Sequence, residues 1–292
     1  MVGFTCNIMK KNKNIIIANP EEFQRKKEAI RRGGAEKLHV LSDFDRTLTY
    51  AMVDGERRDS LMAILRDEKY LTPDYPEKAR ALREKYYPIE IDFSIPLFER
   101  KRAMEEWWAK HFELLVESKL NKRDIGNAIN SAKIKLRGGV MDFSDYLKAK
   151  QVPFVIMSAT GLGEGSVSLF LEKEGRLLEN IHIISNSFEW DKNGYLLKVN
   201  KPIIHAFNKD ETAIHQFPVF NLIKNRKNIL LLGDSPGDAG MSEGFDAENI
   251  VKVGFLNEKA EENMKHYKEL YDVVILNDPP FNFVVELLKE MV

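Results

Sequence analysis

Four short apolar runs recur along the chain, and a polar or small residue follows each of them. The runs and the residues that follow are Leu38–Ser42 before Asp43, Val152–Met157 before Ser158, Ile181–Ser185 before Asn186, and Asn228–Leu232 before Gly233. Continuous apolar runs of this length, separated by helix-like segments, are typical of parallel strands covered on both faces. The pattern therefore predicts an α/β fold with a parallel sheet, whose ligands bind beyond the carboxyl ends of the strands.

A different pattern covers the stretch from about Arg57 to Leu136. Within it, apolar and aromatic residues recur at helical spacing over Leu97–Leu120. Prolines are expected to break the stretch into separate helices, and they are Pro73, Pro76, Pro88 and Pro96. An insertion of this size between the first and second strands predicts a helical cap over the active edge of the sheet.

These patterns divide the chain into three parts. We expect an α/β core over residues 36–56 and 137–292, a helical cap over 57–136, and an N-terminal extension over 1–35. The extension contains a charged helical segment, Pro20–Arg32, which the pair Gly33 and Gly34 ends. We expect this segment to pack on the core, and no motif in it indicates a function.

Composition narrows the class of protein. The 292 residues include 44 Lys plus Arg and 45 Asp plus Glu, so the formal net charge is −1. This balance argues against a surface that coats nucleic acid or an anionic membrane. Cys6 is the single cysteine, so no internal disulfide forms and a reducing environment is expected. No apolar run approaches the roughly 20 residues that a membrane helix needs. We expect a cytoplasmic monomer without a nucleic-acid or membrane partner.

The candidate chemistry begins directly after the first run, where Asp43 and Asp45 are two residues apart in the sequence Asp-Phe-Asp-Arg-Thr-Leu-Thr. Two carboxylates at the end of a strand can face one cavity if the chain turns there. One of them can then attack a substrate while the other transfers a proton. The competing interpretation is a solvated turn. The apolar strand directly before Asp43 favours the catalytic interpretation.

Three further elements are candidates at the same edge. Asp234 and Asp238 lie four residues apart in Gly-Asp-Ser-Pro-Gly-Asp, and such hard oxygen ligands suit Mg²⁺, although a helix-capping turn has the same composition. Ser158 and Ala159 offer a hydroxyl and backbone amides, but serine is also a common N-cap. Lys209 is the fourth element, and a single lysine is more often a surface residue.

In this order, the four elements resemble the motifs of the haloacid dehalogenase-like hydrolase superfamily. Over about residues 36–292, the chain also resembles the cytosolic type III, or pyrimidine, 5′-nucleotidase family. The stretches that carry this second resemblance are Lys85–Glu90, Met104–Trp108, His205–Lys209, Leu231–Ser235 and Gly254–Asn257.

The resemblance implies a Rossmann-like three-layer core with an inserted helical cap, and Mg²⁺-dependent hydrolysis of nucleoside 5′-monophosphates through an aspartyl phosphate. It implies that Asp43 is the nucleophile and Asp45 the general acid and base. By the same resemblance, Asp43, Asp234 and the main-chain carbonyl of Asp45 would bind the metal, and Asp238 would support the metal and the lysine. Phosphate binding is implied for Ser158, Ala159 and Lys209. Nucleoside contacts are implied for Glu106 and Ser131.

Some positions depart from the family pattern or leave alternatives open. Arg46 stands where many members of the family have an apolar residue, and Pro236 stiffens the acidic turn. Trp108 either packs between helices or stacks on the base. Glu106 only accepts hydrogen bonds, so it favours the cytosine amine of CMP or a cationic 7-methyl-GMP, with UMP accepted more weakly, unless it makes a helix-surface salt bridge.

Two alternatives to hydrolysis remain at this stage. One is a phosphotransferase that moves phosphate from a nucleotide to a nucleoside or sugar, and the other is a non-catalytic nucleotide-binding module. The phosphotransferase differs from a hydrolase in its product, which is a phosphorylated acceptor and not free phosphate. The second is disfavoured because Asp43, Asp45, Lys209 and Asp234 are all present.

Overall fold

The centre of the molecule is one seven-stranded sheet with the order β1-β11-β10-β9-β2-β5-β6. The structure is a computed structural model, and it describes residues 13–58, 60–92, 94–131, 133–209, 214, 215 and 217–292. The strands of the sheet are β1 (Ile15–Ile17), β2 (Leu38–Ser42), β5 (Phe154–Met157), β6 (Ile181–Ile184), β9 (Asn228–Gly233), β10 (Asn249–Leu256) and β11 (Val273–Leu276). All neighbouring strands are parallel except β1, which is antiparallel to β11. The predicted parallel α/β fold is confirmed.

The four predicted runs form the neighbouring strands β9, β2, β5 and β6. The first run has the predicted bounds, whereas β5 starts at Phe154 because Pro153 has no N–H group to donate to the ladder. The sequence analysis did not predict β1, β10 and β11. Polar residues interrupt β10, for example at Lys252, so this strand lacks the continuous apolar pattern.

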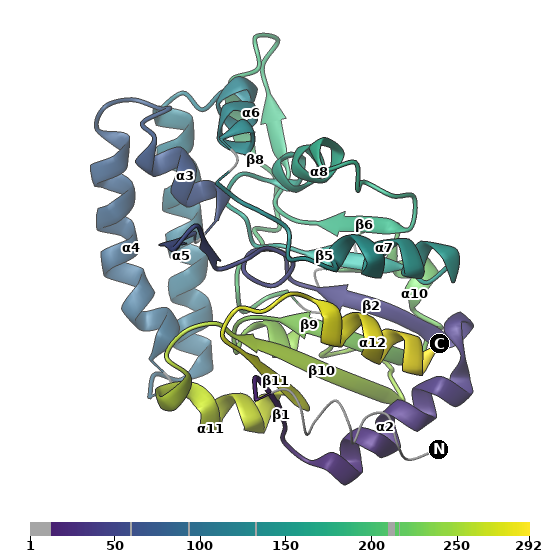
Figure 1. Cartoon of the computed structure of the whole chain (residues 1–292). Coiled ribbons are helices and arrows are strands. Elements are labelled where there is room, and N and C mark those ends of the chain that lie inside the picture. Colours follow the sequence, from purple (N-terminus) through teal and green to yellow (C-terminus); the bar gives the residue numbers. More distant parts are fainter. Residues whose placement is uncertain (1–12, 59, 93, 132, 210–213, 216) are drawn as a thin grey trace.

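Helices cover both faces of the sheet, which gives three layers (Figure 1). The covering helices are α2 (Pro20–Gly33), α7 (Val140–Ala149), α8 (Glu164–Lys173), α10 (Phe220–Ile223), α11 (Ala260–Leu270) and α12 (Asn282–Met291). Successive residues of a strand point to opposite faces, and β5 shows this directly. Phe154 and Ile156 belong to the apolar cluster with α2, α7, α8 and α12, whereas Val155 and Met157 belong to the cluster with α10 and α11.

The described part of the N-terminal extension packs on the core, as expected. Its helix α2 begins with a cap, in which the Asn19 side chain accepts a hydrogen bond from the Glu22 N–H at 3.2 Å. On the face toward α12, the buried Lys27 forms an ion pair with Glu290 at 2.5 Å. Strand β1 pairs with β11 at the edge of the sheet.

The inserted helices lie beside the carboxyl ends of the strands (Figure 1). They are α3 (Leu61–Asp67), α4 (Tyr75–Ile91), α5 (Leu97–Glu117) and α6 (Lys122–Asn130). Helix α5 starts directly after Pro96, as predicted, but the expected break at Pro88 is wrong because this proline lies inside α4. It lies three residues before the end of the helix, so its missing N–H group removes one i→i−4 hydrogen bond and less than one helical turn follows it.

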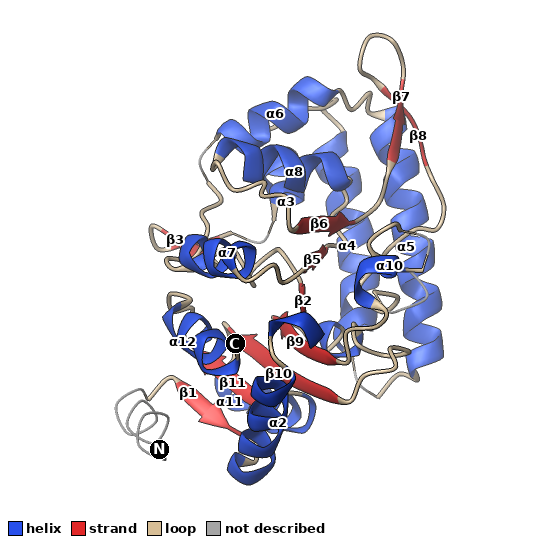
Figure 2. Cartoon of the chain, turned by 90° about the vertical axis from the view of Figure 1, so that its right-hand side faces the viewer, coloured by secondary structure: helices blue, strands red, loops and turns tan. Residues whose placement is uncertain are grey.

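Two small hairpins complete the architecture. The first consists of β3 (Met52–Val53) and β4 (Glu56–Arg57), directly after the Asp43 loop. The second consists of β7 (Phe188–Trp190) and β8 (Leu196–Val199), and it projects from the core along the cap (Figure 2). The Leu196 N–H donates to the Leu120 carbonyl at 2.8 Å, which links this hairpin to the end of α5. No helix among the described residues is long and apolar enough to cross a membrane.

Arg137 joins three loops beneath the active edge, and its side chain is fully buried. Its guanidinium donates to the carbonyls of Thr47 at 2.8 Å and Arg46 at 2.6 Å, and to the Asn257 side chain at 2.9 Å. It also forms an ion pair with Asp278 at 2.7 Å. The loops after β2, β10 and β11 therefore share one buried cation.

We predict that Arg137→Met destabilises the chain by about 3–5 kcal/mol, because it leaves a buried carboxylate and several carbonyls without their partner. Urea unfolding followed by circular dichroism measures this loss. As a control, Lys148→Met removes an exposed pair with Glu179 at 3.9 Å and should change stability by less than about 0.5 kcal/mol. A loss below about 1 kcal/mol for Arg137→Met would contradict the importance of this cation.

Candidate active site

Strand register brings the predicted site residues to one edge of the sheet. Asp43 follows β2, Ser158 follows β5, and Asp234 follows the last residue of β9. Because these strands are parallel neighbours, their carboxyl ends meet, and the Asp43 N–H still donates to the Leu232 carbonyl at 2.9 Å. Ser158 is buried, and its Oγ accepts a hydrogen bond from the Thr160 N–H at 3.1 Å. This bond shapes the loop that the sequence analysis assigned to phosphate.

Lys209 lies between two carboxylates. Its Nζ is 2.6 Å from Asp43 Oδ1 and 2.6 Å from Asp238 Oδ1, and it also donates to the Met157 carbonyl at 3.3 Å. Burial acts to lower the pKa of Lys209, but the carboxylates of Asp238 and Asp43 outweigh it and raise the pKa above its ordinary value. Lys209 is thus a buried ammonium and not the surface lysine of the alternative interpretation.

Asp238 organises the acidic turn after β9. Its Oδ2 accepts hydrogen bonds from the N–H groups of Asp234 at 3.1 Å and Ser235 at 2.9 Å, and from the Ser235 hydroxyl at 2.8 Å. A Cβ atom on Gly233 would lie 2.3 Å from Asp238 Cβ, so only glycine fits this close approach. Since its other oxygen contacts Lys209, Asp238 is placed to support the turn and the lysine.

Four carboxylates, here called the carboxylate cluster, gather at this edge: Asp43, Asp45, Asp234 and Asp238. Ligand atoms of Asp43, Asp234 and Asp238 all lie within 4.8 Å of one another. The buried Asp45 Oδ1 has no hydrogen-bond partner among the described residues. The available donors are hard oxygen atoms, which fit a divalent cation such as Mg²⁺ better than zinc or copper.

Burial and mutual repulsion raise the pKa of three of these carboxyl groups, those of Asp43, Asp45 and Asp234. Burial raises the pKa of Asp43 to about 6, although Lys209 acts against it. Burial raises the pKa of Asp234 to about 8, against the effect of Arg46. The pKa of Asp45 is raised well above its ordinary value by burial and by the charges of Asp43 and Asp234. A protonated Asp45 is the form that donates a proton to a leaving group.

The loop after Asp45 also orients Asp43, a role that was not predicted from the sequence. The Thr47 hydroxyl donates to Asp43 Oδ2 at 3.2 Å, so both oxygens of Asp43 are oriented, one by Thr47 and one by Lys209. The signal was available, because Thr47 belongs to the same short motif. Glu90 and Arg100 also line the cavity, but their approach depends on helix packing that no local pattern reveals.

A cavity of ≈ 750 Å³ lies between the core and the cap. Its size is in the range of cavities that hold drug-sized ligands such as a nucleotide. The core contributes Asp43, Asp45, Ser158, Ala159, Lys209, Asp234 and Asp238 to its lining. The cap contributes Met62, Arg66, Tyr75, Arg83, Tyr87, Glu90, Arg100, Trp107, Trp108 and His111. One end of the cavity is therefore charged, and another part of its wall is aromatic.

Trp108 both packs and lines the cavity. Its ring lies 6.0 Å from that of Trp107 at an interplanar angle of 13°, and 5.6 Å from that of Phe112 at 25°. A Cβ atom on Gly161 would lie only 2.7 Å from Trp108 Cζ3. The tryptophan therefore touches the loop that follows Ser158, and this contact holds the cap against the core.

The structure does not bring Glu106 and Ser131 to the cavity lining. Glu106 is half exposed on α5, and Lys110 donates to its Oε1 at 2.7 Å. This hydrogen bond and one with Tyr86 lower the pKa of Glu106 to about 2. Ser131 follows α6, and its hydroxyl donates to the Ala128 carbonyl at 2.7 Å. Contact of these two residues with a nucleoside stays a prediction.

Together, the parallel sheet, the inserted helices and the Asp43–Lys209–Asp238 arrangement define a hydrolase of the haloacid dehalogenase-like class. A solved hydrolase of this class from Salmonella enterica serovar Typhi shares the fold, with a TM-score of 0.58 and 14% identity over 94% of this chain and 82% of that one. The family model of pyrimidine 5′-nucleotidase (UMPH-1) matches residues 46–292. The chain belongs to this family.

Individual relatives agree with the family assignment. A 7-methylguanosine phosphate-specific 5′-nucleotidase of Mus musculus is 34% identical over 95% of this chain and 92% of its own length. The protein of the same name from Drosophila melanogaster is 33% identical over 93% and 85%. The crystal structure of cytosolic 5′-nucleotidase IIIB bound to cytidine has a TM-score of 0.89 and 29% identity, and covers 100% of this chain and 98% of its own. The chain is thus a 5′-nucleotidase, which hydrolyses nucleoside monophosphates.

The raised pKa of Asp234 predicts how stability depends on pH when EDTA removes divalent metal. The folded chain retains a proton that the unfolded chain releases above its ordinary pKa of 3.8, so stability falls as pH rises toward about 8. Asp234→Asn removes this dependence. In EDTA, its free energy of unfolding relative to wild type should increase between about pH 5 and pH 8, by at most about 1.4 kcal/mol per pH unit.

Urea unfolding at several pH values in EDTA measures the difference, and addition of a divalent cation provides the control. A saturating divalent cation should stabilise the wild type and leave Asp234→Asn nearly unchanged, because a cation that Asp234 helps to hold stabilises only the fold that binds it. A difference that stays constant or shrinks as pH rises would contradict the buried, protonated state of Asp234.

Proposed function

We propose that this chain hydrolyses CMP, UMP and 7-methyl-GMP with Mg²⁺, through an aspartyl phosphate on Asp43. The observation that carries the mechanism is the buried contact of Lys209 with both Asp43 and Asp238, at 2.6 Å each. The family model and the names of the relatives support the pyrimidine and 7-methylguanine substrates. We also propose that the enzyme acts in the cytoplasm, as the name of the solved relative suggests for that protein.

Asp43 is the proposed nucleophile because its two oxygens are oriented and its carboxylate faces the cavity. One oxygen forms a bond to phosphorus while the bond from phosphorus to the 5′ oxygen breaks. Asp45 gives its proton to the departing 5′ oxygen and later takes a proton from the water that attacks the aspartyl phosphate. One difficult displacement thereby becomes two easier ones.

Charge neutralisation is the other requirement, because a phosphate dianion repels an attacking carboxylate. Lys209 supplies one positive charge at Asp43, and Ser158 with the amide of Ala159 is proposed to hold the phosphate oxygens. Mg²⁺, bound by Asp43, Asp234 and the Asp45 carbonyl, would supply the remaining positive charge. Positioning and electrostatic stabilisation of this kind account for most of phosphoryl-transfer catalysis.

The aromatic wall is the proposed site of the base. Trp107 and Trp108 line the cavity with ring planes only 13° apart. The positively charged ring of 7-methylguanine stacks favourably on an electron-rich indole, and a pyrimidine offers the same kind of flat face. A contact of Glu106 with the base would require its side chain to leave Lys110, so we propose stacking as the larger part of base recognition.

A phosphate-release screen over nucleoside 5′- and 3′-monophosphates tests this function. We expect release from CMP, UMP and 7-methyl-GMP but not from 3′-nucleotides, loss of activity in EDTA, and recovery with Mg²⁺. Asp43→Asn keeps the shape of the side chain but removes the attacking anion, so turnover should fall by about 10³-fold or more. Asp145→Asn, an exposed carboxylate that pairs with Arg176, is the matched control and should retain full turnover.

Four outcomes would refute parts of the proposal. Near-normal turnover by folded Asp43→Asn would exclude the aspartyl phosphate, and full activity after exhaustive chelation would exclude the metal. Transfer of phosphate to an added nucleoside or sugar, in place of release, would indicate a phosphotransferase. Trp108→Ala should lower kcat/KM for nucleotides more than for p-nitrophenyl phosphate, and an equal loss on both would exclude base stacking.

A further inference from the structure

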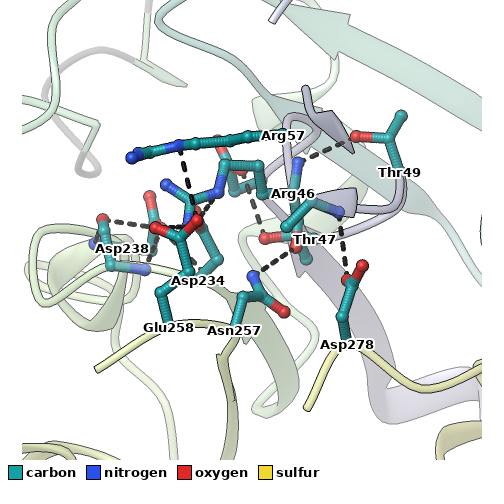
Figure 3. Close-up of polar contacts among 12 residues, drawn as sticks. Arg46, Thr47, Thr49, Arg57, Asp234, Asp238, Asn257, Glu258 and Asp278 are labelled. Carbon is teal, nitrogen blue, oxygen red and sulfur yellow. Dashed lines mark hydrogen bonds and ion pairs between the residues drawn. The ribbon is translucent and has the colours of Figure 1, made fainter. Parts of the chain in front are cut away.

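Arg46 lies at the centre of an ion-pair chain beside the carboxylate cluster (Figure 3). Its Nε is 3.5 Å from Asp234 Oδ2, and its Nη2 is 3.3 Å from Glu258 Oε2. The other oxygen of Glu258 is 3.4 Å from Arg57 Nε, on strand β4 of the first hairpin. One guanidinium therefore contacts a proposed metal ligand and a carboxylate that is no part of the metal site.

Hydrogen bonds with three residues hold the backbone of Arg46. Its φ angle is 63°, and its N–H donates to Thr49 Oγ1 at 2.8 Å. Its carbonyl accepts hydrogen bonds from Arg137 at 2.6 Å and from the Asn257 side chain at 3.0 Å. With this anchored backbone, the guanidinium can shift between Asp234 and Glu258 without any movement of the loop.

The charges show why this position matters. Asp43, Asp234 and Asp238 carry three negative charges when ionised, and Lys209 and Arg46 together carry two positive charges. Arg46 therefore supplies at Asp234 part of the positive charge that a divalent cation would supply. Arg46 already contacts an oxygen of Asp234, and the side chains of Arg46 and Asp234 are only 22% and 13% exposed. Water screens this ion pair less than it screens a surface pair.

We propose that Arg46 competes with Mg²⁺ for Asp234, and that Glu258 moderates this competition by giving the guanidinium a second carboxylate. This inference rests on the Mg²⁺ requirement of the proposed function. Its consequence is that Arg46 raises the Mg²⁺ concentration that the chain needs, while it keeps the metal-site carboxylate paired when Mg²⁺ is scarce.

Isothermal titration calorimetry of Mg²⁺ into the full chain, after EDTA treatment and dialysis, tests the proposal without any substrate. Arg46→Gln should bind Mg²⁺ about tenfold more tightly than the wild type, which is the usual scale of coupling between competing ligands. Arg46→Lys keeps the charge and should stay within about threefold of the wild type. Circular dichroism checks that both variants are folded.

Two further variants separate direct competition from the general field of a positive charge. Arg57→Gln removes the same charge from a residue whose Nε lies 3.4 Å from Glu258, so its effect on Mg²⁺ affinity should stay within about twofold, well below that of Arg46→Gln. Glu258→Gln removes the second partner of Arg46 and should weaken Mg²⁺ binding several-fold. In the Arg46→Gln background, the same Glu258→Gln change should have no such effect.

The role of Arg46 is refuted if Arg46→Gln binds Mg²⁺ no more tightly than the wild type. It is also refuted if Arg57→Gln tightens binding as much, or if Glu258→Gln weakens binding equally without Arg46. A wild type that binds no Mg²⁺ and releases phosphate in EDTA would refute the metal requirement of the proposed function itself. A chain that binds Mg²⁺ with an affinity that Arg46 does not change would instead refute only the present inference and leave the metal requirement in place.

Discussion

Repulsion among four closely spaced carboxylates, of which Asp43 and Asp238 are buried and Asp45 and Asp234 half-buried, is the constraint on which the organisation of this site depends. Desolvation and like charges raise the pKa of Asp43, Asp45 and Asp234, so the cluster persists only where cations or protons balance it. Lys209 provides this balance from within the core, with contacts to two of the carboxylates. The same repulsion favours a divalent cation at the site, and it favours the protonated form of Asp45 that the proposed general acid needs.

The cap and the core are linked at the elements that carry this chemistry. The guanidinium of Arg100, on α5, lies 4.5 Å from the ring centre of Phe207, two residues before Lys209. On the other side, Trp108 contacts the loop after Ser158 through Gly161. The aromatic wall is thus positioned relative to the loops proposed to hold phosphate. A displacement of the cap would therefore shift the loops that carry Ser158 and Lys209 as well as the proposed site of the base.

The core of the site could be predicted from sequence because short apolar runs place the residues that follow them at one edge of a parallel sheet. Asp43, Ser158 and Asp234 lie there for this reason. The cap could not be predicted to the same depth, since the direction of a helical side chain depends on the helix packed against it. Glu106 faces Lys110 and solvent, and Arg46 meets Glu258 across 212 positions of sequence, so neither placement follows from a local pattern.

The most direct test of the mechanism is whether phosphate becomes attached to Asp43 during turnover. Rapid mixing with CMP that carries a ³²P-labelled phosphate, an acid quench and peptide mapping would measure this attachment, because acyl phosphates survive brief exposure to acid. The account predicts label on the peptide that contains Asp43 within the first turnover, and none in Asp43→Asn. Phosphate release at the normal rate with no labelled protein at any time would contradict it.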